Sequence, residues 1–408
     1  MTAVVLVVFV AVYAGMATGR LPGMAFGRAG IAALAAAFLV VAGAIPPAAA
    51  LASVDFATLA VLGGLMAVSA RLGEAGLYGR VAAGVAGAAG RPRRLLFLTI
   101  LAAGGLSALL ANDVVVFAMA PVLCAGLRVR GLDPRPHLAG LAGAANAGSA
   151  ATLIGNPQNI LIGTAGGLDF WGFVAACEPF ALFALLAVHG AVSLAWRREL
   201  AAPPSAPAPA MPAVAPGGMA VGVLALAAFV ILVGGGADRT AAALGIGALV
   251  LLLARPGAQA RLLGAIDWKL ILLFAGLFIV NGALAGTGLP ARALAGLEAA
   301  GIDIAGAPFL SGFSVLASNT IGNVPATILL LAQVPDPGPA ALRLVALVST
   351  LAGNLLLVGS LANIIVSERA AAAGVRFGFS DHLRAGPAMT LAALLPVFLW
   401  LAAGYTLG

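Results

Sequence analysis

Apolar residues fill this chain in runs of about 16–25 positions, separated by short segments with arginine, aspartate, glycine or proline. Runs of that length suit membrane-spanning helices, whereas the strands of a membrane barrel alternate polar and apolar positions over about 10 residues. The pattern therefore predicts an all-α polytopic membrane protein. The predicted spans cover residues 3–18, 30–49, 56–70, 138–165, 173–195, 218–234, 240–254, 268–287, 344–367 and 387–406.

Composition agrees with this prediction and excludes several other classes of protein. Hydrophobic residues make up 62% of the chain and charged residues only 9%, with a mean hydropathy of +1.11. A soluble domain has about 25% charged residues. The 54 glycines follow no Gly-X-Y period, which excludes collagen. A chain this apolar is neither disordered nor a nucleic-acid-binding protein, despite its net charge of +7.

Two further apolar stretches, residues 95–126 and 304–334, are interrupted by polar residues near the middle. The arms on either side of each interruption have about 12–14 residues, too short for a hydrocarbon core of about 30 Å. We therefore predict two re-entrant hairpins. Such backbone is tolerated only where it is buried in protein or faces water. The interruptions contain Asn112 and Asp113 in the first stretch, and Ser318, Asn319, Thr320, Asn323 and Pro325 in the second.

The distribution of basic residues supports ten spans and two hairpins. With both termini outside, every Lys and Arg except Arg239, Arg292 and Arg343 falls on the inner side, which is 18 of 21. This asymmetry follows the positive-inside rule. We therefore expect a multi-pass protein of the bacterial inner membrane with periplasmic termini.

The order of elements recurs on either side of a proline-rich segment. Residues 200–217 contain no apolar run and read as a cytoplasmic linker. Three spans, a hairpin, a broken span and a last span occur within residues 1–199 and again within 218–408. Five spans are an odd number, so the two repeats are predicted to be inverted, as in many secondary transporters. The pairs Gly155 and Gly359, and Asn159 and Asn363, each lie 204 residues apart.

Helix breaks inside two of the predicted spans indicate a binding site. In span 138–165, Gly155 is followed by Asn156, a favoured N-cap, and by Pro157, which suits the first helical position. Gly359 and Ser360 repeat this arrangement in span 344–367. Asn112 or Asp113 could cap the return arm of the first hairpin, and Asn323, followed by Pro325, that of the second. Four helix N-termini near the centre of the membrane could bind an anion without an arginine.

Asp113 is the one acidic residue expected near the middle of the membrane. A carboxylate there is costly and marks a functional candidate, either as a proton carrier or as a ligand of Na⁺. The alternative is that Asp113 only caps its helix, and the two roles are compatible. Asn146, Ser149, Thr152, Thr350 and Asn354 could line the site or form hydrogen bonds between helices.

At these motifs the chain resembles the ion transporter superfamily, which includes arsenite permeases, sodium/proton antiporters, citrate transporters and divalent anion/sodium symporters. The YbiR-like permeases are the most similar group. The similarity rests on Asn112-Asp113, the run Gly155-Asn156-Pro157-Gln158-Asn159, Ser318-Asn319 and Gly359-Ser360. It implies an elevator-type transporter whose hairpins enclose the substrate, and a possible homodimer. In the anion symporters of this group, Ser-Asn-Thr signatures at the hairpin tips hold Na⁺ and substrate.

Ser318-Asn319-Thr320 matches that signature, but the first hairpin has Asn112-Asp113 instead. Antiporters of the group tend to have an acidic residue in the second hairpin, whereas this chain has Asn323 there. In this respect the chain resembles the arsenite permeases more than the antiporters. We therefore expect Na⁺ near Asn112, Asp113 and Asn319. The candidate substrate- and ion-binding residues are Asn112, Asp113, Asn146, Ser149, Thr152, Gly155, Asn156, Pro157, Asn159, Ser318, Asn319, Thr320, Asn323, Pro325, Asn354, Gly359, Ser360 and Asn363.

The leading functional hypothesis is a secondary transporter for a small inorganic or organic anion or oxyanion, coupled to H⁺ or Na⁺. Arsenite or antimonite efflux by proton exchange and sodium/proton antiport are alternatives, and a channel is a further one. No cofactor or metal centre is expected. An intramembrane enzyme is disfavoured because the sequence has no His-Glu-x-x-His motif and no evident histidine partner for Ser149 or Ser360.

Overall fold

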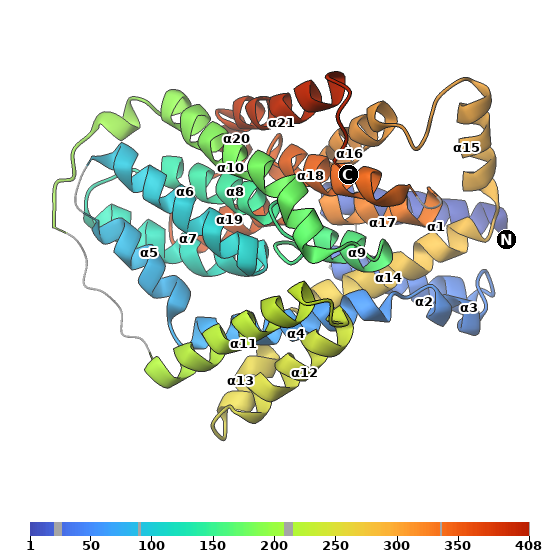
Figure 1. Ribbon diagram of the computed structural model, residues 1–408, viewed down its shortest axis with the longest axis horizontal. Coiled ribbons are helices and arrows are strands. Elements are labelled where there is room, and N and C mark those ends of the chain that lie inside the picture. The colour runs from blue at the N-terminus through green and yellow to red at the C-terminus, as the bar shows by residue number, and fades with distance from the viewer. Residues whose placement is uncertain (20–26, 89–90, 208–214, 335–336, 408) are drawn as a thin grey trace.

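The computed structural model describes residues 1–19, 27–88, 91–207, 215–334 and 337–407, and its regular elements are helices (Figure 1). The all-α prediction is confirmed, and six helices within these described ranges are long and apolar enough to cross a membrane. Residues 208–214 of the predicted linker lie outside the described residues.

The first half forms α1 Thr2–Thr18, α2 Arg28–Val41, α3 Pro47–Ala52, α4 Phe56–Glu74, α5 Leu77–Gly87, α6 Pro92–Leu109, α7 Asn112–Val129, α8 Arg135–Ser149, α9 Pro157–Ala165, α10 Phe170–Ala195 and the 3-10 turn η1 Glu199–Ala201. The second forms α11 Pro216–Gly234, α12 Arg239–Leu252, α13 Ala258–Gly264, α14 Trp268–Ala285, α15 Leu289–Ala299, α16 Ala307–Ile321, α17 Asn323–Gln333, α18 Gly338–Ala352, the 3-10 turn η2 Leu357–Gly359, α19 Leu361–Ala372, α20 Phe379–Leu383 and α21 Gly386–Ala402.

Both spans with a predicted break are divided in the structure. Span 138–165 forms α8 and α9, and span 344–367 forms α18 and α19 with η2 between them. The prediction for residues 30–49 is wrong in its second half, because α2 ends at Val41. Gly43 then adopts a left-handed φ of 69°, and Pro46 is the extended N-cap of the short helix α3. A left-handed residue followed by prolines cannot continue the helix.

The two predicted hairpins differ in length. We call α6 and α7 the first hairpin and α16 and α17 the second. Each helix of the first hairpin has 18 residues, which is roughly 27 Å of helix, so the expectation that these arms are too short to span is wrong. The helices are longer than expected because Arg93 and Arg94 of α6 and Arg128 of α7 lie inside them. The arms of the second hairpin have 15 and 11 residues. A re-entrant course for either hairpin stays a prediction.

The helices pack in two groups, which Figure 1 shows at the bottom and the top of the view. In the lower group α4 packs against α12 and α2 packs against α14. The upper group contains the first hairpin, α8, α10, α18, α19 and α21, with α8 packed between α6 and α10. The second hairpin joins the groups, since α17 packs against α14 and α16 packs against α18. We call these two sets the lower and upper groups.

The order of helices in the first half recurs in the second. Asp55 caps α4 and Asp267 caps α14, each through its side chain, and these residues are 212 positions apart. Gly76 before α5 and Gly288 before α15 are separated by the same interval, and both have a positive φ. The two halves also pack against each other in a reciprocal way. Helix α4 of the first half contacts α12 of the second, and α2 of the first half contacts α14 of the second. These features support the predicted repeat, while its inversion in the membrane and its boundaries stay predictions.

Candidate functional site

The break between α8 and α9 is built by a short sequence around Asn156. The Asn156 side chain accepts a hydrogen bond from the Asn159 backbone N–H at 2.8 Å, and Pro157 takes the first helical position, so the predicted N-cap is confirmed. Gly155 is required there because a Cβ would lie 2.5 Å from the Ser149 carbonyl oxygen and 2.7 Å from that of Ser107. The Asn159 amide donates to the carbonyls of Ser149 and Thr152. Together these contacts hold an irregular backbone inside the helix bundle.

The break between α18 and α19 uses different side-chain contacts at corresponding positions. Ser360 occupies the N-cap position, but its side chain makes no capping hydrogen bond, so that part of the prediction is wrong. Its hydroxyl instead donates to the Asn146 side-chain oxygen at 2.9 Å. Asn363 donates to the Gly353 carbonyl at 2.8 Å and to that of Leu356 at 3.3 Å. The Ser360 hydroxyl, which could have capped α19, is therefore hydrogen-bonded to a side chain of the other half.

Two side chains connect the halves in a crossed arrangement. Asn146 on α8 donates to Asn354 at 2.8 Å and to Asn363 at 3.2 Å, both of which belong to the second half. Thr350 on α18 lies 204 positions after Asn146 and accepts hydrogen bonds from Asn156 at 3.3 Å and Gln158 at 3.1 Å in the first half. Each half thus completes the helix break of the other. Buried hydrogen bonds of this kind are costly to leave unmade.

The tip of the first hairpin is attached to the α8–α9 break. The Asn112 backbone N–H donates to the Gly155 carbonyl at 2.9 Å, and its side chain donates to Asn146 at 3.2 Å. Thr152 donates to the Ala108 carbonyl at the end of α6. Ala111, which has no side-chain acceptor, is the N-cap of α7, so the expectation that Asn112 or Asp113 caps this arm is wrong. Both residues lie inside the first helical turn.

The tip of the second hairpin is attached to the α18–α19 break by Asn319. Its amide nitrogen donates to the carbonyls of Val315 and Ala352, both at 2.9 Å, and its oxygen accepts from the Leu356 backbone N–H at 3.1 Å. These contacts use both hydrogens of the amide and one of the two lone pairs of its oxygen. The expected role of Asn319 as a Na⁺ ligand stays a prediction.

Three other predicted residues of the second hairpin lie in different surroundings. Gly322, with φ 93°, is the N-cap of α17, so Asn323 is not a cap, and its side-chain oxygen faces the Val324 N–H. Thr320 is exposed and donates back to the carbonyls of its own helix, away from the amide network. Pro325 is buried, and its carbonyl accepts a hydrogen bond from Tyr13 at 3.4 Å.

Several buried polar atoms around the breaks have no partner within the described chain. They include the hydroxyls of Ser107 and Ser318 and the side-chain oxygens of Asn112 and Gln158. Asp113 is half-buried in the first turn of α7, and it has no hydrogen bond or ion pair in the described part of the protein. Unpartnered buried groups of this kind are expected where a ligand or ordered water binds.

Sequence reasoning missed several residues that contact these breaks. Gln158 lies in the Gly-Asn-Pro-Gln-Asn run, and Ser107 lies 211 positions before Ser318, so the motif and the repeat could have identified both. No sequence signal pointed to His382 on the short helix α20. Its Nε2 lies 2.9 Å from the Asn354 carbonyl oxygen, and burial lowers its pKa to about 4.

The chemical character of the site is that of amides, hydroxyls and free helix ends. Amide and hydroxyl oxygens can coordinate Na⁺, and helix N–H groups can bind an anion. No cluster of three or more His, Cys, Asp or Glu side chains that could hold a metal ion occurs among the described residues.

Comparison with known proteins identifies the family. The sequence pattern of the citrate transporter family matches residues 4–352, most of the chain. The chain belongs to the citrate transporter family. This family assignment confirms the similarity to the ion transporter superfamily, and it makes the protein a member of a family of transporters.

Individual relatives agree with the citrate transporter assignment. The inner membrane protein YbiR of Escherichia coli (strain K12) is 32% identical over 84% of this chain and 87% of its own length. The 46 kDa membrane protein of Mycobacterium leprae (strain TN) is 30% identical over 85% and 86%. Among solved structures, the Alcanivorax borkumensis YdaH transporter superimposes with a TM-score of 0.57 at 17% identity, covering 100% of this chain and 98% of that one. At this identity the match shows a shared fold alone.

Proposed function

We propose that this protein is a secondary active transporter that moves a small anion or oxyanion across the bacterial inner membrane, coupled to H⁺ or Na⁺. The observation that carries the proposal is the crossed amide network at two matched helix breaks, with unpartnered polar atoms beside it. Helix N-termini would bind the anion, and Asn112 and Asp113 would bind the coupling ion. The name of the family, citrate transporter, supports an anionic substrate.

An elevator movement is the proposed mechanism. The upper group contains the breaks and the first hairpin, and the most extensive helix packing lies within each group, as between α6 and α8 or between α4 and α12. A site enclosed by one group could therefore move relative to the other with its hydrogen bonds intact. Both termini are proposed to be periplasmic because that orientation satisfies the positive-inside rule.

Transport by the purified protein in proteoliposomes tests this proposal. The panel contains citrate, other carboxylates, phosphate, sulfate and arsenite, each with imposed H⁺ or Na⁺ gradients. We expect uptake of one anion to depend on one gradient, and Asp113→Asn to lose that dependence. Glu298→Gln is the matched control, because Glu298 is exposed on α15. Wild-type coupling in Asp113→Asn would overturn the assigned role of Asp113.

The same assay distinguishes the alternative functions. Arsenite or antimonite efflux is a second candidate because Asn323 replaces the acid expected of an antiporter in the second hairpin. It predicts arsenite flux driven by a proton gradient, and metalloid resistance in a sensitive strain. Proton flux driven by Na⁺ alone, with no anion present, would instead favour sodium/proton antiport.

A further inference from the structure

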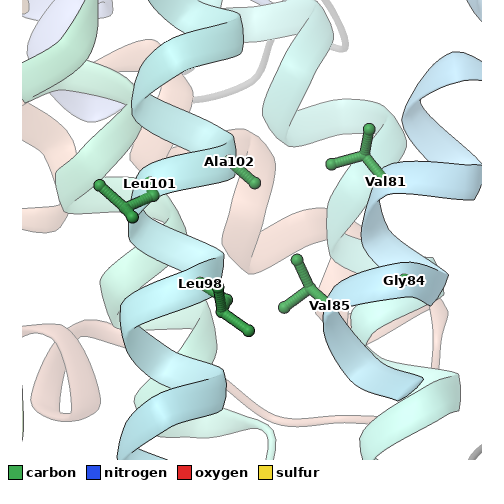
Figure 2. Close-up of a pocket in the computed structure, with 6 residues that line it drawn as sticks. All are labelled: Val81, Gly84, Val85, Leu98, Leu101 and Ala102. Atoms are coloured by element: carbon green, nitrogen blue, oxygen red, sulfur yellow. The ribbon is translucent and has the colours of Figure 1, made fainter. Parts of the chain in front are cut away.

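An apolar pocket lies between α5 and α6, away from the helix breaks. Figure 2 shows Val81, Gly84 and Val85 of α5 facing three residues of α6 across it. Leu101 is 46% exposed, so the pocket opens to the outside of the protein. The six lining residues are Val81, Gly84, Val85, Leu98, Leu101 and Ala102.

One end of this pocket is strongly basic. Arg91, the N-cap of α6, is followed by Arg94, Leu98 and Leu101 at successive intervals of three or four residues, so the two arginines share the helix face that lines the pocket. Both arginines are exposed, and neither belongs to an ion pair in the described chain. The first turn of α6 has no acid and no side-chain cap, which leaves the positive end of the helix uncompensated.

The position of the pocket in the membrane indicates what kind of molecule could bind both its apolar walls and its basic end. The positive-inside rule places Arg91 and Arg94 at the cytoplasmic surface, where anionic lipids are concentrated. From Arg94 to Ala102 the helix rises roughly 12 Å, so the pocket extends from the headgroup level into the acyl region. A soluble anion would pair with the arginines but leave the apolar walls of the pocket without a partner. A neutral lipid would fill the apolar walls but leave the arginines without an anionic partner.

We propose that the α5–α6 pocket binds an anionic phospholipid, with an acyl chain between Val85 and Leu98 and the phosphate at Arg91 and Arg94. This site is independent of the proposed transport function. Arg93 lies on another face of α6, because Phe97, four residues further on, packs edge-on against His189 of α10 with ring centroids 5.4 Å apart. Arg93 therefore provides a control with the same charge in the same helical turn.

Thermal unfolding of the purified protein in detergent tests the proposal, with phosphatidylglycerol, phosphatidylcholine or soluble glycerol phosphate added. We expect phosphatidylglycerol to raise the midpoint by about 3–5 °C, since a ligand that binds the folded state stabilises it. Phosphatidylcholine and glycerol phosphate should change it by about 1 °C or less. Native mass spectrometry should show retained phosphatidylglycerol.

Variants separate specific binding from general contact with lipid. Arg91→Gln combined with Arg94→Gln should lose most of the phosphatidylglycerol effect, whereas Arg93→Gln should keep it. Ala102→Phe fills the pocket without changing charge and should also reduce the effect. Equal stabilisation by the two lipids, or by glycerol phosphate alone, would overturn the proposal. An unchanged shift in the double arginine variant and in Ala102→Phe would also overturn it, and if the double variant does not fold, Arg94→Gln alone replaces it.

Discussion

A buried histidine beside a helix break makes stability depend on pH. Burial lowers the pKa of His382 to about 4 in the folded protein, below the ordinary value of 6.5. Above pH 6.5 the residue is neutral in both the folded and unfolded states. Between pH 6.5 and about 4 the unfolded chain binds a proton that the folded protein excludes, so stability falls as the pH falls and levels off below about 4.

We predict that His382→Gln reduces this loss of stability. The loss from His382 between pH 7 and pH 5 is about 2 kcal/mol, and glutamine can keep a donor near the Asn354 carbonyl without titrating. Thermal unfolding at pH 7 and pH 5 measures the difference. The other buried histidine, His137, is present in both proteins and cancels in the comparison. An equal pH dependence in the variant and the wild type would contradict this assignment.

Neighbouring residues of the predicted Ser-Asn-Thr signature have unequal roles. We predict that Asn319→Ala lowers stability by about 2–4 kcal/mol and transport by more than about tenfold, because the Ala352 carbonyl and Leu356 N–H lose their partner. Thr320→Ala should change stability by less than about 0.5 kcal/mol and keep transport, since Thr320 is exposed. Proteoliposome uptake and thermal unfolding measure both effects. Loss of transport in Thr320→Ala would place that residue in the site after all.

At this scale the sequence identified the polar residues of the site but not their partners. Asn156 could be assigned as an N-cap because the preference is local, depending on the next few residues. The assignments of Asn112 and Asn323 as caps failed because each helix begins one residue earlier than expected, with Ala111 and Gly322 as the N-caps. Ser360 does not cap because its hydroxyl donates to Asn146 in the other half. Asn146, which accepts the hydrogen bond from Ser360, lies 214 positions away in the sequence. Local residue preferences cannot predict a contact over that distance.

Close contact between two helices limits what can change in α6 and α8. A Cβ at Gly148 would lie 2.2 Å from the Gly104 carbonyl oxygen, whereas a Cβ at Gly105 meets nothing within 4 Å. Backbone atoms cannot move aside as the end of a flexible side chain can. The helices must therefore separate if residue 148 is larger than glycine.

We predict that Gly148→Ala destabilises the protein by about 1–3 kcal/mol through this overpacking. Gly105→Ala, the matched control on α6, should be neutral or stabilise by up to about 1 kcal/mol because alanine favours the helix. Thermal midpoints in the same detergent compare the two variants. A Gly148→Ala protein as stable as Gly105→Ala would show that α6 and α8 separate at little cost.

At the scale of elements, apolar periodicity located the helices better than it located their ends. The breaks in spans 138–165 and 344–367 were visible because glycine, asparagine and proline mark them locally. The lengths of α6 and α7 were underestimated because the charged residues at their ends are helical too. Arginine is a good helix former, so charge marks the end of an apolar run without marking the end of a helix.

At the scale of the whole molecule, a tyrosine connects the lower group to the second hairpin. The Tyr13 hydroxyl on α1 donates toward the Pro325 carbonyl of α17, at 3.4 Å, and Asn281 of α14 donates to that hydroxyl at 2.8 Å. Tyr13 does not take part in the amide network at the breaks. Its contacts therefore stabilise one position of the second hairpin relative to the lower group, and they reach the candidate site only at the backbone carbonyl of Pro325.

We predict that Tyr13→Phe raises the maximal transport rate by up to about fivefold, because about 1 kcal/mol is removed from this arrangement alone. The apparent KM should stay within about twofold of wild type. Initial rates across substrate concentrations in proteoliposomes measure both quantities, with Tyr405→Phe as an exposed control. A change confined to KM would instead place Tyr13 in substrate binding.

The crossed contacts of Asn146 and Thr350 have a consequence for chains cut in two. Each partner set lies on the other side of residues 200–217, so a fragment ending at residue 207 keeps Asn146 but loses Asn354, Ser360 and Asn363. A fragment starting at residue 215 likewise keeps Thr350 without Asn156 or Gln158. Either fragment produced alone should be degraded in the cell, whereas the pair produced together should accumulate as a complex held by these buried amides.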